Sequence, residues 1–110
     1  MNTVGENIRK FRIYNGMSQK ELGDMVGRTS TVISNWENGV HSPDLEMTEE
    51  LCRTLHVTPS QLLGWEENAE IEAFYENQES ILIEIDNMLS AKDILEKRIK
   101  AYREKLRKRD

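Results

Sequence analysis

Short polar side chains gather between a glycine at position 27 and a Trp-Glu-Asn-Gly segment at positions 36–39. They are Thr29, Ser30, Thr31, Ser34, Asn35 and Asn38. Hydroxyl and amide groups can hydrogen-bond to the edges of DNA bases, and an asparagine suits adenine in particular. The same residues could form an ordinary solvated helix face, so the choice between these two interpretations depends on the elements around them. In this setting we predict contact with bases.

The remaining composition gives no sign of catalysis or of a bound metal. Cys52 is the only cysteine, and His41 and His56 are isolated, so we expect no metal site and no cofactor. No motif pairs a nucleophile with a base, so we do not expect an enzyme. A lone thiol fits a reducing cytoplasm. Charges within the first 14 residues argue against a signal peptide, and no apolar run approaches the roughly 18 residues of a membrane span.

The net charge of −5 is distributed unevenly along the chain. Residues 66–89 contain eight acidic residues and no basic one, whereas residues 90–110 contain nine basic and four acidic residues. Residues 1–65 are nearly balanced, with six basic and eight acidic residues. Long-range attraction to DNA would therefore be modest, and binding would depend more on specific contacts.

Helix signals divide the first 65 residues into five short segments. Thr3–Glu6 and Ser18–Glu21 fit capping boxes, and Gly16 and Gly27 suit helix ends. With the apolar spacing, these signals predict helices over about 3–15, 18–26, 29–38, 43–55 and 58–63. The expected fold class is all-α, with a domain over residues 1–65 and a helical segment over 66–110.

Residues 8–63 resemble the Cro/repressor-type helix-turn-helix family, also called Xre or lambda-repressor-like. The matching residues are Ile8, Arg12, Gly16–Gln19, Glu21, Leu22, Val26, Gly27, Ile33, Ser34, Trp36–Gly39, Pro43, Leu55 and Val57–Leu63. The resemblance implies a five-helix DNA-binding domain in which the third helix enters the major groove. One departure is Gly23, where relatives carry alanine. It costs about 1 kcal/mol of helix propensity but leaves room for a close helix approach.

The resemblance also implies roles for particular residues. Ser30, Thr31 and Asn35 would read bases with help from Ser34, and Arg12 would form a partly buried ion pair with Glu37. Gln19 would lie near a phosphate or base, and Asn38 with its neighbouring backbone N–H groups would hold a phosphate. Arg28 replaces an apolar turn residue and would point toward a phosphate. The predicted DNA-binding set is Gln19, Arg28, Thr29, Ser30, Thr31, Ser34, Asn35 and Asn38.

The segment from Glu67 to Lys108 lacks proline and glycine, and its apolar residues recur every 3.5 residues. Position a of this heptad is occupied by Ile71, Gln78, Ile85, Lys92, Ile99 and Leu106, and position d by Phe74, Ile81, Met88, Leu95, Tyr102 and Arg109. A long helix cannot bury such a stripe on itself. Tyr75, Leu82 and Leu89 widen the stripe, which favours either a larger bundle or contact with the N-terminal domain. The predicted association surface is Ile71, Phe74, Ile81, Ile85, Met88, Leu95, Ile99, Tyr102 and Leu106.

The arrangement of this segment has two alternatives. Ser90–Asp93 also fits a capping box, so the helix could break near residue 90 and fold back as a hairpin. Charge favours antiparallel packing in either case, because only opposed directions set the acidic part against the basic part. The pairing could lie within one chain or between two chains.

We therefore predict a sequence-specific DNA-binding transcriptional regulator, with repression as the expected action. It would bind a pseudo-palindromic operator in double-stranded DNA as a dimer or higher homo-oligomer. The alternative is an antitoxin or anti-repressor-type module whose C-terminal helix binds a protein partner. A regulatory protein partner competing for that helix is expected in preference to a small-molecule inducer.

Overall fold

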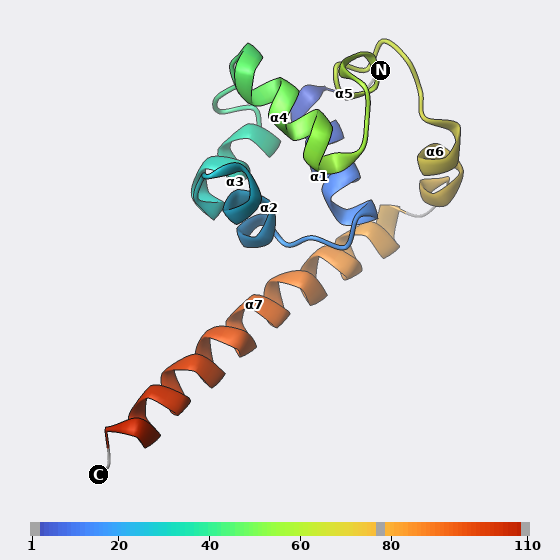
Figure 1. Ribbon diagram of the computed structural model, residues 1–110. Helices are drawn as coiled ribbons and strands as arrows, with labels where there is room; N and C mark the ends of the chain where they lie inside the picture. Colours follow the sequence, from blue (N-terminus) through green and yellow to red (C-terminus); the bar gives the residue numbers. More distant parts are fainter. Residues whose placement is uncertain (1–2, 77–78, 109–110) are drawn as a thin grey trace.

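The computed structural model describes residues 3–76 and 79–108, and its regular elements there are all helices, as predicted (Figure 1). In chain order they are α1 (Val4–Tyr14), α2 (Gln19–Val26), α3 (Ser30–Glu37), α4 (Leu45–Leu55), α5 (Pro59–Leu62), α6 (Ala69–Tyr75) and α7 (Glu79–Arg107). The first five match the five predicted helices. Two helices, α6 and α7, stand where the heptad pattern predicted one.

Local capping sets where α2 and α3 begin. The Ser18 hydroxyl accepts a hydrogen bond from the Glu21 N–H at 3.0 Å, and the Glu21 carboxylate accepts one from the Ser18 N–H at 3.2 Å. This is the predicted capping box. Gly27 ends α2 with a left-handed φ of 71°, and Thr29 caps α3 by accepting from the Val32 N–H. These caps fix the short turn between the two helices.

The hydrophobic core lies where α1 to α5 meet. Its most deeply buried apolar side chains are Ile8, Leu22, Ile33, Leu51, Leu55 and Leu62. Trp36 is also buried, so the face of α3 that carries Ile33 and Trp36 turns inward. The opposite face of α3 therefore points to solvent, because an α-helix repeats every 3.6 residues.

Two helical glycines allow close backbone approaches that no other residue would permit. A Cβ at Gly23 would lie 2.5 Å from the carbonyl oxygen of Arg28. A Cβ at Gly5 would lie 2.3 Å from the carbonyl oxygen of Trp36. The expected close approach at Gly23 is confirmed, although its neighbour is the turn before α3. Gly23 and Gly5 therefore set how closely α2 and α1 approach the two ends of α3.

Helix α6 lies beyond the predicted boundary at residue 65 but packs against the domain. Ile71 is 4% exposed and joins the core. The Tyr75 hydroxyl donates to the carbonyl oxygen of Lys10 at 2.8 Å, and the Phe74 ring meets the Tyr14 ring edge-on at 5.4 Å between centroids. The assignment of Ile71 to an association surface is therefore corrected, since Ile71 is buried in the domain. Phe74 is 46% exposed, so its place in an association surface stays a prediction.

Helix α7 runs unbroken from Glu79 to Arg107, so of the two alternatives the continuous helix is found, and the break near residue 90 with an intrachain hairpin is wrong. A helix without glycine or proline keeps its backbone hydrogen bonds by continuing through Ser90, whereas a hairpin would have to give several up. The heptad run is interrupted earlier, at Glu76, whose backbone (φ −56°, ψ 119°) is extended. Gln78 and Arg109 of the heptad series lie outside the described residues.

The two halves of α7 have different surroundings. Its first half lies beside α1 and passes the start of α2, and its second half projects from the domain (Figure 1). Leu82, Ile85 and Leu89 are half-buried, whereas every described residue from Ile94 onward is exposed. The widened stripe thus contacts the N-terminal domain, one of the two arrangements the sequence favoured.

Candidate nucleic-acid interface

The solvent-facing side of α3 presents the predicted base-reading residues. Ser30 and Thr31 are exposed, and Ser34 and Asn35 are half-buried on the same helix. Within the described parts of the chain, the side chains of Ser30, Thr31 and Asn35 bond no other protein group. Their hydroxyl and amide groups are therefore available to an external hydrogen-bonding partner. Because these side chains are short, that partner would have to approach α3 closely.

Other predicted contacts already have roles within the protein. The Thr29 hydroxyl caps α3, and the Gln19 amide donates to Glu37 Oε1 at 3.1 Å. The Asn38 amide donates to the Ser34 hydroxyl at 3.3 Å and stays exposed. The backbone N–H groups of Asn38 and Gly39 bond to carbonyl oxygens of α3. These backbone groups are therefore already bonded within the protein, and the predicted phosphate contact would fall to the Asn38 side chain.

Few lysine and arginine side chains near α3 are available to contact a phosphate. Lys20 pairs with Asp24 at 2.9 Å, which raises the pKa of Lys20. Arg28 is exposed and donates to the Gly27 carbonyl oxygen at 3.0 Å, so its guanidinium points along the turn between α2 and α3. Helix α3 itself contains no lysine or arginine. The face presented by α3 is thus polar but nearly uncharged.

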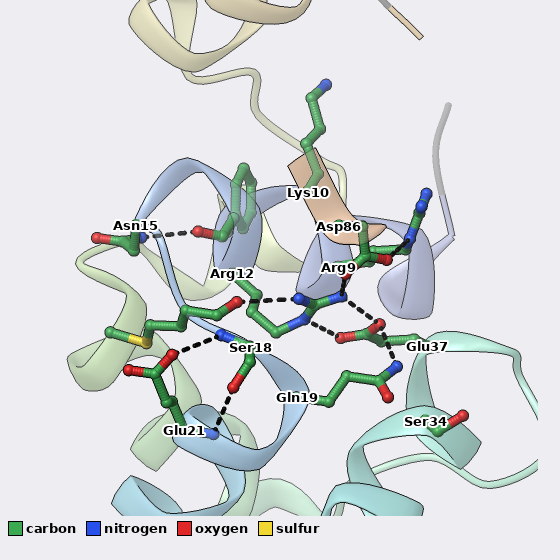
Figure 2. A network of polar contacts seen from close by, with 12 residues as sticks. Arg9, Lys10, Arg12, Asn15, Ser18, Gln19, Glu21, Ser34, Glu37 and Asp86 are labelled. Carbon is green, nitrogen blue, oxygen red and sulfur yellow. Dashed lines mark hydrogen bonds and ion pairs between the residues drawn. The ribbon is translucent and has the colours of Figure 1, made fainter. Parts of the chain in front are cut away.

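A buried ion-pair network centred on Arg12 links α1 to α2 and α3 (Figure 2). Arg12 is fully buried and donates to both carboxylate oxygens of Glu37, at 2.7 and 3.0 Å. It also donates to the Met17 carbonyl oxygen at 2.9 Å. Burial alone would lower the pKa of Arg12, but Glu37 and Asp86 raise it overall, so Arg12 stays charged. The Arg12–Glu37 pair implied by the family resemblance is present, and Glu37 links it to Gln19.

Helix α7 adds a second carboxylate to this network. Asp86 accepts from Arg12 at 3.1 Å and from Arg9 at 3.2 Å. Further along α7, Lys92 donates to Glu21 at 3.3 Å. Burial opposes ionisation of Glu21, but hydrogen bonds from Ser18 and Lys92 lower its pKa overall. The basic and acidic side chains of α1 and α2 therefore hold the first half of α7 in place.

Sequence reasoning missed these contacts of α7 for an identifiable reason. Asp86 lies outside positions a and d, so the heptad pattern gave it no role. Lys92 stood out only as a charged residue at position a. The acidic run over residues 66–89 is the available signal, and the charge pattern alone predicts that it pairs with the basic part over residues 90–110, within one chain or between two chains. In the structure, part of it pairs with α1 instead.

In residues 3–76 and 79–108, no group of three histidine, cysteine or acidic side chains is arranged to hold a metal ion. None of the described helices is both long enough and apolar enough to span a bilayer. The feature that stands out for function is the exposed polar face of α3.

Comparison with known proteins points to the same region. A helix-turn-helix family model matches residues 8–62. The chain is 27% identical over 88 residues to the uncharacterized HTH-type transcriptional regulator YqaE of Bacillus subtilis, covering 80% of this chain and 74% of YqaE. It is 28% identical over 61 residues to antitoxin PezA of Streptococcus pneumoniae serotype 4, covering 56% of this chain but only 39% of PezA.

A solved structure gives a spatial comparison. The P22 c2 repressor, crystallised with the synthetic operator 9T, aligns with a TM-score of 0.57 and 33% identity. The alignment covers 60% of this chain and all of the repressor chain. The likeness therefore concerns a part of this chain the size of the N-terminal domain.

Proposed function

The chain belongs to the helix-turn-helix family of DNA-binding transcriptional regulators, and on this premise we propose that it represses transcription by binding a specific operator. Helix α3 would enter the major groove, and α2 would cross the backbone above it. Occupation of promoter DNA would then block transcription. The observation that carries this proposal is the exposed polar face of α3, with Ser30, Thr31 and Asn35 free to bond.

The proposed division of labour follows from which side chains are free and which are committed. Asn35 would make a bidentate contact with adenine, while Ser30 and Thr31 would contact neighbouring bases with help from Ser34. Arg28 and the Asn38 amide would hold phosphates. Gln19 would meet the backbone while its amide stays bonded to Glu37. Thr29 would act mainly by capping α3, which keeps the helix start at a fixed height in the groove.

The nearly uncharged face of α3 bears on specificity. Phosphate contacts position a protein on the duplex but do not read its sequence, and base contacts supply that reading. With few cations near α3, non-specific attraction should be weak and its salt dependence shallow. Discrimination between DNA sequences would therefore depend on the short side chains of α3.

Selection of bound sites from a random DNA pool tests this proposal directly. A two-fold dimer should select a pseudo-palindrome with half-sites about one helical turn, or roughly 34 Å, apart. Asn35→Ala should then weaken binding to the selected site by about 1–3 kcal/mol and leave non-specific binding unchanged. Asn87→Ala provides the matched control, because Asn87 is exposed on α7 away from α3. Equal losses on both DNAs would exclude Asn35 as a base reader.

A second candidate function is that of an antitoxin, in which DNA binding serves autoregulation and the C-terminal helix binds a protein partner. The similarity to PezA favours it. The two functions differ in what occupies α7 in the cell. A stoichiometric complex with an unrelated protein, purified from the native host, would favour the antitoxin.

A further inference from the structure

An apolar stripe on α7 is left uncovered along its whole length by the domain. It consists of Ile81, Met88, Leu95, Ile99, Tyr102 and Leu106, each between 42% and 64% exposed. Leu82, Asp86 and Leu89 lie on the side that faces α1, and the stripe lies on an adjoining side of the helix. Ile85 and Lys92 border both sides, since Ile85 is half-buried and Lys92 reaches Glu21. The stripe and these two residues form a complete series of heptad positions a and d.

We propose that this stripe binds a second copy of α7 in antiparallel orientation, with the two-fold axis between Asp93 and Ile94. This deepens the proposed function, on which it rests, by assigning the contact that joins two DNA-binding domains. A symmetric dimer buries the same patch on both subunits, so the patch must be complementary to itself. The stripe meets that requirement, because it runs from residue 81 to 106 and is centred on the middle of α7.

The position of the two-fold axis determines which residues of the two helices face each other. Antiparallel coiled coils place position a of one helix against position d of the other. About the midpoint of α7, Ile81 lies opposite the partner's Leu106, Ile85 opposite the partner's Tyr102, and Met88 opposite the partner's Ile99. Lys92 lies opposite the partner's Leu95. A shift by one heptad in either direction leaves several of these residues without an apolar counterpart, so this register buries the most apolar surface.

Charges beside the stripe favour the same orientation. In the antiparallel register, Glu84 lies near the partner's Lys105 on both sides of the dimer. A parallel, in-register pair would instead place Lys92 against the partner's Lys92 within the apolar contact and Arg98 near the partner's Arg103. The antiparallel arrangement also suits Lys92, because its ammonium group already bonds Glu21 while its aliphatic stem can cover the partner's Leu95.

Distances between spin labels distinguish the two orientations. Ser90 and Glu104 are exposed and occupy the same heptad position on the outer side of α7. Each would be replaced by cysteine, labelled and measured as a dimer, with the buried Cys52 replaced by alanine. The antiparallel register predicts an axial separation of about 10 Å for the Ser90 labels and about 30 Å for the Glu104 labels. Equal distances at the two positions would indicate a parallel dimer and overturn the proposal.

Charge reversal gives an independent test that needs no label. Lys105→Glu should weaken dimerisation about tenfold, because it replaces two attractions with two repulsions. Adding Glu84→Lys should restore most of the affinity, since the pair is then reversed. Lys100→Glu, on the outer side of α7, serves as the control and should have little effect. Additive losses in the double variant would overturn the register.

Two measurements on the same protein distinguish a failure of the proposed dimer from a failure of the proposed DNA binding. Light scattering measures its mass, and fluorescence anisotropy measures its affinity for the selected operator. A chain that remains monomeric at micromolar concentration yet binds operator would refute the antiparallel dimer and leave the proposed function standing. A dimer with the predicted label distances that prefers no duplex would refute the function alone.

Discussion

The domain formed by α1–α6 and the helix α7 bury their apolar residues in opposite ways. In the domain, side chains such as Ile8, Leu22 and Leu51 are fully buried within the same chain. On α7, Met88 and Leu95 are more than half exposed. The domain should therefore unfold with a midpoint independent of protein concentration. Structure that depends on association through α7 should become more stable as concentration rises.

The ion pairs between the domain and α7 also differ in how deeply they are buried. Arg12 is enclosed by the domain and bonds to two carboxylates, whereas Arg9 is one-third exposed and, among the described residues, bonds to the Asp86 carboxylate only. An enclosed charge cannot turn to water when its partner is lost, but an exposed charge can. Asp86 thus takes part in two ion pairs. The pair with the buried Arg12 should contribute strongly to stability, and the pair with the partly exposed Arg9 should contribute little.

Removing Arg12 should have the largest effect on the domain. Arg12→Met would leave the buried Glu37 carboxylate without its guanidinium, so we expect a loss of about 3–5 kcal/mol in the free energy of unfolding. Arg9→Met should cost less than about 1 kcal/mol, because that pair is partly exposed. Urea denaturation followed by circular dichroism measures both. Similar small losses in the two variants would mean that burial does not distinguish these pairs.

An acidic substitution within the stripe should affect association without affecting the domain. Ile99→Asp introduces two charges into the dimer contact and should weaken dimerisation by about hundredfold or more. Ile94→Asp is the matched control, because Ile94 is 56% exposed and Ile99 50%, but Ile94 lies off the stripe. Analytical ultracentrifugation gives the dissociation constants. If Ile94→Asp proved equally disruptive, the association surface would have to be redrawn around the other face of α7.

Gly23→Ala tests whether backbone approach outweighs helix propensity. Alanine is favoured over glycine in a helix by about 1 kcal/mol, but its Cβ would lie 2.5 Å from the Arg28 carbonyl oxygen. We expect a net loss of about 1–2 kcal/mol in the free energy of unfolding, together with weaker operator binding as the turn before α3 shifts. Thermal unfolding and anisotropy measure the two effects. A stabilised variant would show that α2 can move away without cost.

The contact between Lys92 and Glu21 should produce the smallest effect, visible as a dependence on pH. The pKa of Glu21 is lowered below its ordinary value of 4.5 in the folded protein. Its contribution to stability is therefore complete above that value and is lost as pH falls through the lower folded pKa. Glu21→Gln should be less stable than the wild type near about pH 6, and the difference should shrink below pH 4.5. A constant difference across this range would rule out the ionised carboxylate as its source.

Much of the domain could be predicted because its signals are local. Capping residues such as Ser18 and Thr29 act on backbone groups two or three positions away, and Gly27 ends α2 through its own backbone conformation. The inward faces of Ile33 and Trp36 follow from the helical repeat, and they leave Ser30, Thr31 and Asn35 outward. The heptad pattern of α7 could also be predicted. The pattern does not tell, however, which of its residues the domain covers and which are left for another molecule.

The amino-acid sequence alone was enough to predict where the first five helices begin and end and which side of α3 faces solvent. The burial of Ile71 in the core and the contact of Asp86 with Arg12 became visible only in the folded molecule. These two kinds of information differ in their range along the chain. Caps and helical periodicity act over a few residues, whereas a contact between positions 12 and 86 depends on how the intervening helices pack.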